Sequence, residues 1–333
     1  MDIRKILPIA FLFLVLATCI TGCSAESETA SDEKNVQPYL NITESFYTDE
    51  YESGMESRCY IYDLDNKEFV QKGKVPYTSA YPLTLYSNKE NIIFYSALSN
   101  RGDQLYRDNE GEEEQLTDQF CALNYIFQCG DKLFLAAKYL EKYCIEPFLY
   151  DLGTGEVVQV FPDPDDDRFT WSAVSDPNNN KVYFSYYSDN LGRELMSRDN
   201  SLGNVEYPEE PPSTICVLDV DTETVSEVYE TDGYISGMAA DGDYLYYGGA
   251  ESSSSPDEDF KCYRINIKSG ERTELPVPVV ITGQMAYWDN ILYCLGWKDG
   301  IRGIYAVNLD TYETELIHEQ EDGGFINGMS LNY

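Results

Sequence analysis

The 333-residue sequence predicts an all-β fold built from a repeated unit of four strands. Three observations lead to this prediction. A strand-turn-strand pattern recurs along the chain, and a further strand precedes most of its copies. No segment after the first 30 residues has a convincing long helical period, so helices are not expected to build the core.

The repeated pattern is a β-hairpin signature, in which alternating apolar residues lead into an Asp, Asn, Gly or Thr turn and a second short strand. It occupies residues 59–70, 105–116, 148–160, 215–228, 262–275 and 304–317. Another strand, such as NIIFYSAL or DKLFLAAKY, stands before each of the later five. Four strands repeating every roughly 42–50 residues, with one longer interval between the third and fourth copies, predict a single β-propeller.

The two ends of the repeat predict how the ring closes. GGFINGM (323–329) matches DGYISGM (232–238), which begins an inner strand, yet only one strand follows before Tyr333. The N-terminal LNITESFYT stands before the first hairpin with no inner strand ahead of it. We therefore expect six four-stranded blades, with the C-terminal strand as the inner strand of blade one. A seventh blade in residues 188–213 is the alternative, although this segment is too polar and Pro-rich for four strands.

The repeats resemble the β-propellers of the TolB and YWTD kind. LYRDNEGEEEQLT is similar to their unit of strand, Asp/Asn-Gly turn, strand and Leu-Thr, and the resemblance covers most of residues 39–333. The YWTD tetrapeptide itself is absent. The resemblance implies the fold and says little about function, because propellers support many unrelated activities.

The first residues have the pattern of an export signal. Arg4 and Lys5 precede an apolar run from Ile6 to Ile20, which is shorter than a membrane span. Ile20-Thr21-Gly22-Cys23 then resembles the lipobox of bacterial lipoproteins. The resemblance implies cleavage after Gly22, a diacylglycerol thioether on Cys23 and acylation of the new amino terminus. Two or three acyl chains make a stable anchor, so we expect an extracytoplasmic protein on a bacterial cell membrane. An ordinary signal peptide is the alternative.

The chain is accordingly divided into three parts. Residues 1–22 are expected to be the lipoprotein signal peptide, and residues 39–333 the propeller. Residues 23–38 are small, polar and acidic without apolar periodicity, which predicts a flexible tether between them.

The charge of the chain is strongly acidic, with 59 Asp and Glu against 23 Lys and Arg and a net charge of −36. Such a field repels nucleic acids and anionic headgroups, so we expect no nucleic-acid partner. It favours cations, cationic peptides or neutral ligands.

The cysteines and the single histidine give no catalytic or zinc-binding pattern. After removal of the signal and lipidation of Cys23, seven widely spaced cysteines remain, and no CxxC pair is present. We expect buried free thiols, with one disulfide as the alternative. His318 is the only histidine, so zinc sites and His-dependent triads are excluded, and we expect His318 to be an exposed loop residue.

Acidic loops are expected to meet on one face of the propeller. These are residues 161–167, 188–213 with Glu206, Glu209 and Glu210, 252–260 and 318–324. The candidate ligand-face residues are Asp163, Asp165, Asp166, Asp167, Asp257, Glu258, Asp259 and Trp297. The first four could coordinate Ca²⁺, the only cofactor considered, and a solvated acidic loop is the alternative.

Aromatic residues form the other unusual feature, with 29 tyrosines in the chain. Tyr183, Tyr246, Tyr293 and Tyr305 alternate within strands and are expected to pack between blades. Trp297, Tyr139 and Tyr143 lie in loops and are candidates for contact with a sugar or a peptide. The Arg-Gly-Asp tripeptide within residues 100–103 is interpreted as a turn.

These observations predict a monomeric, membrane-anchored binding or scaffolding module without catalysis, whose ligand is a glycan or a protein. The alternative is a carbohydrate-active enzyme, a glycosidase or lyase, that uses two carboxylates. An accessory subunit of an envelope assembly is the third reading.

Overall fold

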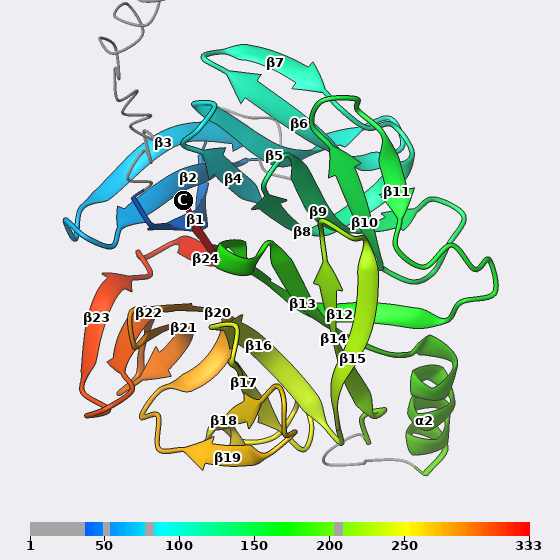
Figure 1. The fold of residues 1–333 in the computed structure, drawn as a ribbon, viewed down its shortest axis with the longest axis vertical. Coiled ribbons are helices and arrows are strands. Elements are labelled where there is room, and N and C mark those ends of the chain that lie inside the picture. The colour runs from blue at the N-terminus through cyan, green and yellow to red at the C-terminus, as the bar shows by residue number, and fades with distance from the viewer. Residues whose placement is uncertain (1–36, 49–53, 77–82, 203–208) are drawn as a thin grey trace, which may run out of the picture. The chain divides into compact units, whose positions relative to one another are not determined.

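Six antiparallel sheets of four strands make up the described part of the chain. The computed structural model describes residues 37–48, 54–76, 83–202 and 209–333; the signal, most of the tether, Cys23 and Glu206 lie outside them. The sheets follow one another around a ring as the blades of a β-propeller (Figure 1). The predicted six-bladed, all-β fold is therefore confirmed.

The strands of each blade are hydrogen-bonded in order from an inner to an outer strand. Blade one contains β24 (Gly324–Asn332), β1 (Tyr39–Tyr47), β2 (Met55–Asp63) and β3 (Phe69–Pro76). Blade two contains β4 (Thr84–Ser87), β5 (Ile92–Ser99), β6 (Gly102–Asn109) and β7 (Glu112–Gln115). Blade three contains β8 (Phe120–Cys129), β9 (Lys132–Tyr139), β10 (Glu146–Asp151) and β11 (Val157–Gln159).

The remaining blades have the same order. Blade four contains β12 (Arg168–Asp176), β13 (Lys181–Ser188), β14 (Ser213–Asp219) and β15 (Thr224–Thr231). Blade five contains β16 (Tyr234–Ala240), β17 (Tyr244–Ala250), β18 (Lys261–Asn266) and β19 (Arg272–Leu275). Blade six contains β20 (Val280–Trp288), β21 (Ile291–Lys298), β22 (Ile301–Asn308) and β23 (Thr314–Glu319).

The hairpin turns between the third and fourth strands share one chemical device. An Asp or Asn near the end of the third strand accepts backbone N–H groups two or three residues further on, which holds the chain in a tight turn. Asp63, Asp108, Asp151, Asp219, Asn266 and Asn308 play this role, one in each blade. The Asp/Asn turn chemistry read from the sequence thus forms every blade's outer hairpin.

The ring closes through pairing of the two ends of the described chain. β24 pairs antiparallel with β1, with Leu40 opposite Leu331 and Ile42 opposite Met329. In Figure 1 the red C-terminal strand lies beside the blue N-terminal one. The predicted inner strand of blade one is confirmed.

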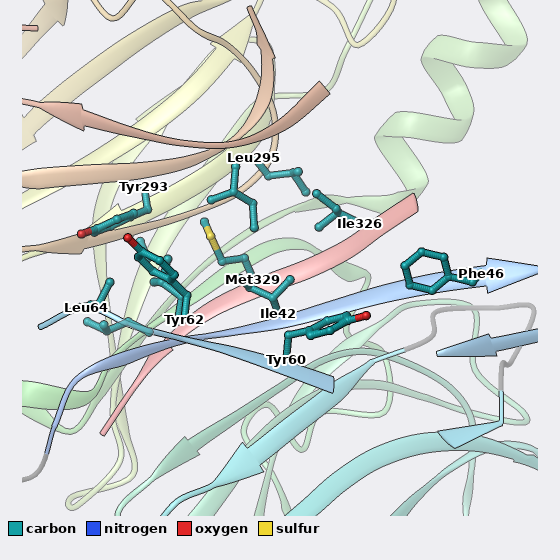
Figure 2. Close-up of a cluster of buried hydrophobic side chains, with 13 residues drawn as sticks. Ile42, Phe46, Tyr60, Tyr62, Leu64, Tyr293, Leu295, Ile326 and Met329 are labelled. Carbon is teal, nitrogen blue, oxygen red and sulfur yellow. The ribbon is translucent and has the colours of Figure 1, made fainter. Parts of the chain in front are cut away.

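A hydrophobic cluster joins blades one and six at this closure (Figure 2). Ile42, Ile326 and Met329 lie on one side, and Tyr293 and Leu295 of β21 lie on the other. All five side chains are almost fully buried. Because burying a large apolar side chain contributes about 1.5–3 kcal/mol, this cluster stabilises the closed ring without a covalent link.

The inner strands of blades five and six approach each other at glycines. A Cβ atom added at Gly237 of β16 would overlap the backbone carbonyl of Gly283 in β20. Only glycine leaves room for this approach, so the two inner strands can pack backbone to backbone.

Residues 189–202 form a helix that the sequence pattern did not indicate. Helix α2 (Asp189–Leu202) follows β13 directly and belongs to none of the six sheets, so the described helix does not build the core. The described residues between β13 and β14 add no strand, as expected from the polarity of this segment. In the described ranges, no helix is long and apolar enough to cross a membrane.

The cysteines and strand tyrosines lie where the sequence predicts. The seven cysteines of the propeller are free, and all except the half-buried Cys121 are buried. Burial raises the pKa of Cys59, Cys129 and Cys262 to about 12, so these thiols stay protonated at neutral pH. The four predicted tyrosines are also buried, namely Tyr183, Tyr246, Tyr293 and Tyr305.

Candidate functional site

Exposed apolar side chains gather on one face of the propeller. We call it the loop face; it is the face on which the second strand of each blade joins the third, as at residues 140–145, 251–260 and 299–300. The large exposed apolar residues at this face are Tyr47, Leu98, Leu140, Tyr143, Trp171, Leu191, Met196, Trp297 and Ile301.

The opposite face differs in its exposed apolar side chains. It is formed by the turns between the first and second strands and between the third and fourth strands of each blade. No large exposed apolar side chain of the described ranges lies in these turns; the other four (Phe69, Val70, Val158 and Leu316) lie on outermost strands. Exposed apolar area concentrated on one face is typical of an interaction surface.

A cleft of about 240 Å³ opens on the loop face between α2 and blades four and five. Its apolar walls are Trp171, Tyr187, Met196, Pro211, Tyr234 and Ile235. Its polar lining includes Asp189, Arg193, Glu209 and Glu210. The site therefore combines aromatic rings with a surplus of carboxylates.

Trp171 is the residue that joins the two blades at the cleft. It lies on β12, where its pairing with β13 is interrupted by a bulge, and its indole Nε1 donates a hydrogen bond of 3.1 Å to the Ile235 carbonyl of β16. Its ring lies 5.7 Å from that of Tyr234 and 6.3 Å from that of Tyr187. The ring remains 39% exposed, so it is fixed in position and accessible to a ligand.

The N-terminus of α2 is held by Asp167, which the sequence suggested as a Ca²⁺ ligand. The Asp167 carboxylate accepts hydrogen bonds from Ser188 Oγ at 2.5 Å and from the backbone N–H of Asn190 at 3.4 Å. Acidic groups at a helix N-terminus stabilise it. Asp189 in the first turn pairs with Arg193 at 2.7 Å. Asp167 thereby positions the helix that forms one wall of the cleft.

A second, more open groove of about 740 Å³ continues from the cleft across blade five. The two share Glu209, Glu210, Gly233 and Tyr234. The groove adds Asp232, Tyr247, Glu251, Asp259, Tyr263 and Arg272. Arg272 is the one cation among its described lining residues. It donates a hydrogen bond of 3.2 Å to the Tyr247 hydroxyl and lies 4.7 Å from the Tyr263 ring, so it is already engaged.

Both carboxylates that the cleft and the groove share, those of Glu209 and Glu210, have polar partners. Glu210 accepts hydrogen bonds from the Ser253 N–H at 2.9 Å and the Ser253 hydroxyl at 2.7 Å, which ties the segment before β14 to blade five. Glu209 forms an ion pair with Arg198 of α2. These contacts hold the rim between the cleft and the groove in place.

The predicted ligand-face residues are spread over the loop face. Asp257, Glu258 and Asp259 form a short 3-10 helix between β17 and β18, and Asp259 lines the groove. Trp297 lies on β21 of blade six, outside both the cleft and the groove, with the Arg302 guanidinium 5.8 Å from its ring.

The four aspartates proposed as Ca²⁺ ligands have separate roles. Burial alone would raise the pKa of Asp166, but the hydrogen bonds and charge of Arg168 outweigh it and lower that pKa. The Asp163 carboxylate accepts the Asp165 N–H at 3.0 Å. Among residues 37–48, 54–76, 83–202 and 209–333, no group of three or more His, Cys, Asp or Glu is placed to hold a metal ion. A Ca²⁺ site in this loop stays a prediction.

The remaining loop candidates have mixed outcomes. Tyr143 is exposed and packs against the Arg193 guanidinium of α2 at 4.6 Å. Tyr139 instead packs on the core, stacked on Phe120 and edge-on to Phe148. The Arg-Gly-Asp tripeptide starts in a turn, and Asp103 is buried, which confirms the interpretation as a turn.

His318 does not lie in an exposed loop, and that expectation is wrong. It belongs to β23, its ring stacks on Phe69 of blade one, and its Nε2 lies 2.8 Å from the buried Glu44 carboxylate of β1. Glu44 needs a polar partner because it is fully buried. The histidine therefore links blade six to blade one at the ring closure.

The aromatic residues of the cleft were not identified as candidates from the sequence. Trp171, Tyr187 and Tyr234 stand in FTWS, SYYS and DGYIS, each at the loop-face end of a strand. Aromatic residues at these strand ends are the signal that could have identified them.

Fold and cleft together define a β-propeller with an aromatic, acidic cleft on its loop face. No protein-family model matches the chain, and no curated protein sequence matches it. The fold is similar to that of a chain in a crystal structure of a nidogen/laminin complex, with a TM-score of 0.55, 12% identity and coverage of 88% of this chain and 98% of that one. It is also similar to TolB from Acinetobacter baumannii, with a TM-score of 0.56, 15% identity and coverage of 89% of this chain and 66% of TolB. At these identities the similarity shows the fold alone.

Proposed function

We propose that this protein is an extracytoplasmic lipoprotein, anchored through Cys23, whose propeller binds an extracellular ligand or protein partner on the loop face without catalysing a reaction. The main support is the concentration of exposed apolar side chains on that face, beside an aromatic cleft. A neighbour in fold that comes from a nidogen/laminin complex supports a protein as the partner.

The direction of β1 supports the combination of anchor and binding face. β24 begins at Gly324, which pairs with Phe46 on the loop face, so Tyr39 at the start of β1 lies at the opposite face. A tether that leads from a lipid on Cys23 to Tyr39 would enter the propeller there. The described chain therefore enters the propeller at the face opposite the proposed binding face.

The anchor is tested by Cys23→Ser, with Cys19→Ser as the matched control within the same segment. We expect the protein to incorporate labelled palmitate and to sediment with membranes, and Cys23→Ser to lose both properties while Cys19→Ser keeps them. Retention of label by Cys23→Ser would contradict the anchor.

Binding is tested by thermal unfolding in the presence of cell-wall and host glycans, basic peptides, Ca²⁺ and EDTA. A ligand at a hundredfold excess over its Kd adds about 2.7 kcal/mol, enough to raise Tm by several degrees. We expect at least one ligand to raise Tm, and the loop-face change Leu98→Ser combined with Met196→Ser to reduce the effect. The matched control is Val70→Ser combined with Leu316→Ser on outermost strands. Release of reducing sugar from a glycan would instead support the carbohydrate-active enzyme.

A further inference from the structure

The cleft and the groove form one continuous site. They share Glu209, Glu210, Gly233 and Tyr234, so a ligand that fills the cleft can extend past these residues over blade five. The cleft's volume of about 240 Å³ is below the roughly 300 Å³ at which pockets for drug-sized ligands begin. Such a combination fits an extended chain that inserts one side chain into the cleft.

The charge of this site is negative. Six carboxylates line it, those of Asp189, Glu209, Glu210, Asp232, Glu251 and Asp259, against the guanidinium groups of Arg193 and Arg272. Both cations are already engaged, Arg193 by Asp189 and Arg272 by the Tyr247 hydroxyl. Within the described ranges, Asp232, Glu251 and Asp259 form no ion pair, and all three are exposed. Their charges are available to a ligand.

The aromatic walls of the cleft favour the same kind of ligand. Trp171, Tyr187 and Tyr234 surround the opening, and Trp171 is held in place by its hydrogen bond to Ile235. Aromatic faces attract Lys and Arg head groups, and their apolar area covers the methylene stems of these side chains. Asp189 and Glu209 also line the cleft, each paired with an arginine of α2, so the unpaired negative charge lies on the blade-five side.

We propose that the cleft and groove bind an extended, positively charged polypeptide segment, with one Lys or Arg side chain inserted into the cleft against Trp171, Tyr187 and Tyr234. This inference rests on the proposed function and specifies its partner as a basic segment of a protein. The carboxylates of blade five contact the remaining basic residues. A neutral glycan would use the aromatic walls but not these carboxylates, so the two ligand classes are distinguishable by charge.

The test measures binding of fluorescein-labelled octapeptides to the full chain by fluorescence anisotropy. The probes are a basic peptide of alternating Lys and Ala, the same peptide with Glu in place of Lys, and a neutral one with Gln. We expect the basic peptide to bind with a Kd of about 1–100 μM and to lose affinity as NaCl increases from 50 to 300 mM. The acidic and neutral peptides should not bind.

Two sets of variants locate the binding. Met196 on α2 is 65% exposed at the mouth of the cleft, so Met196→Lys should weaken binding of the basic peptide several-fold, and Met196→Glu should strengthen it. Val70→Lys, at a 39% exposed position on the outermost strand of blade one and outside both the cleft and the groove, is the matched control and should leave Kd unchanged.

Charge removal in the groove provides the second set. The triple variant Asp232→Asn, Glu251→Gln and Asp259→Asn should weaken binding about tenfold, because it removes three exposed, individually weak charge pairs with the ligand. Asp65→Asn, Asp289→Asn and Asp310→Asn remove the same charge from the opposite face and should leave Kd unchanged.

The outcomes separate this inference from the proposed function. The proposed location of the site would be wrong if both triple variants raised the Kd of the basic peptide equally. It would also be wrong if neither Met196 substitution changed that Kd. No binding of the basic peptide together with a Tm increase by a glycan would overturn the basic partner and leave the binding function in place. No binding to any probe or panel ligand would overturn both.

Discussion

Glu146, the first residue of β10, is a carboxylate buried near the loop face. Its side chain is almost inaccessible, and neither oxygen accepts a hydrogen bond from any described residue. Burial raises the pKa of Glu146; Lys142, 3.9 Å away, opposes this effect, and the negative charge of Asp166 adds to it. The ionised form is therefore less favourable in the folded protein than in the unfolded chain.

Glu146→Gln should stabilise the protein at neutral pH. A group whose folded pKa is raised contributes stability below its unfolded pKa, near 4.5 for this residue, and this contribution is lost as pH rises through the folded pKa. We expect Tm of Glu146→Gln to exceed that of the parent at pH 7 by about 1–3 °C, with the difference vanishing toward pH 4. Thermal unfolding from pH 4 to 8 measures this. Glu141→Gln in the exposed neighbouring turn is the control, and a lower Tm for Glu146→Gln at pH 7 would contradict the prediction.

Residue contacts across the ring could not be predicted from the sequence. His318 and Glu44 are 274 positions apart, and only closure of blade one against blade six brings them together. The strands that carry Trp171, Tyr187 and Tyr234 were predicted. The cleft, however, depends on the bulge in β12 and on helix α2, and neither of these has a clear signal in the sequence. The acidic loops were predicted to share a face because strand order alone determines that.

At the scale of elements, the strands were predictable and the helix was not. Alternating apolar residues and Asp or Asn turns are local signals, and the six outer hairpins form where those signals stand. Helix α2 has the sequence DNLGRELMSRDNSL, with Gly192 and several Asn and Ser residues that are poor helix formers. Its start is stabilised by Asp167 and Ser188, so packing and capping outweigh weak propensity.

Removing β24 should abolish folding. Ile326, Met329 and Leu331 are buried, and losing their burial costs about 5–9 kcal/mol, comparable with the whole stability of a domain. A chain that ends at Asp322 should show no cooperative thermal transition by circular dichroism. A synthetic peptide of residues 323–333 added in trans should restore the transition, whereas a scrambled peptide should not. Cooperative unfolding of the shortened chain alone would contradict the role of β24 in closing the ring.

The stability of the whole molecule depends on its net charge as well as on closure of the ring. A net charge of −36 on 333 residues produces repulsion that opposes the compact state. The described ion pairs between exposed side chains, such as those of Lys67 with Glu315 and Lys89 with Asp131, offset only a small part of it.

Salt should therefore stabilise the protein. Raising NaCl from 10 to 300 mM shortens the screening length from about 30 Å to well under 10 Å, which weakens repulsion between distant carboxylates. We expect Tm to rise by several degrees, and KCl at equal ionic strength to act alike. A fall in Tm would contradict this. An additional increase with CaCl₂ at equal ionic strength, reversed by EDTA, would support the predicted Ca²⁺ site.

The pairing of β24 with β1 also determines when the propeller ring can close during folding. Among the described strands, β1 stands earliest in the chain, yet its inner neighbour is β24, which stands after all the others. Until β24 is in place, one edge of β1 and the apolar side chains of blades one and six lack their partners. Such long-range pairing is slow and leaves unpaired strand edges open to aggregation. Closure of the ring therefore requires β24, and the apolar surfaces that β24 covers stay exposed until it pairs with β1.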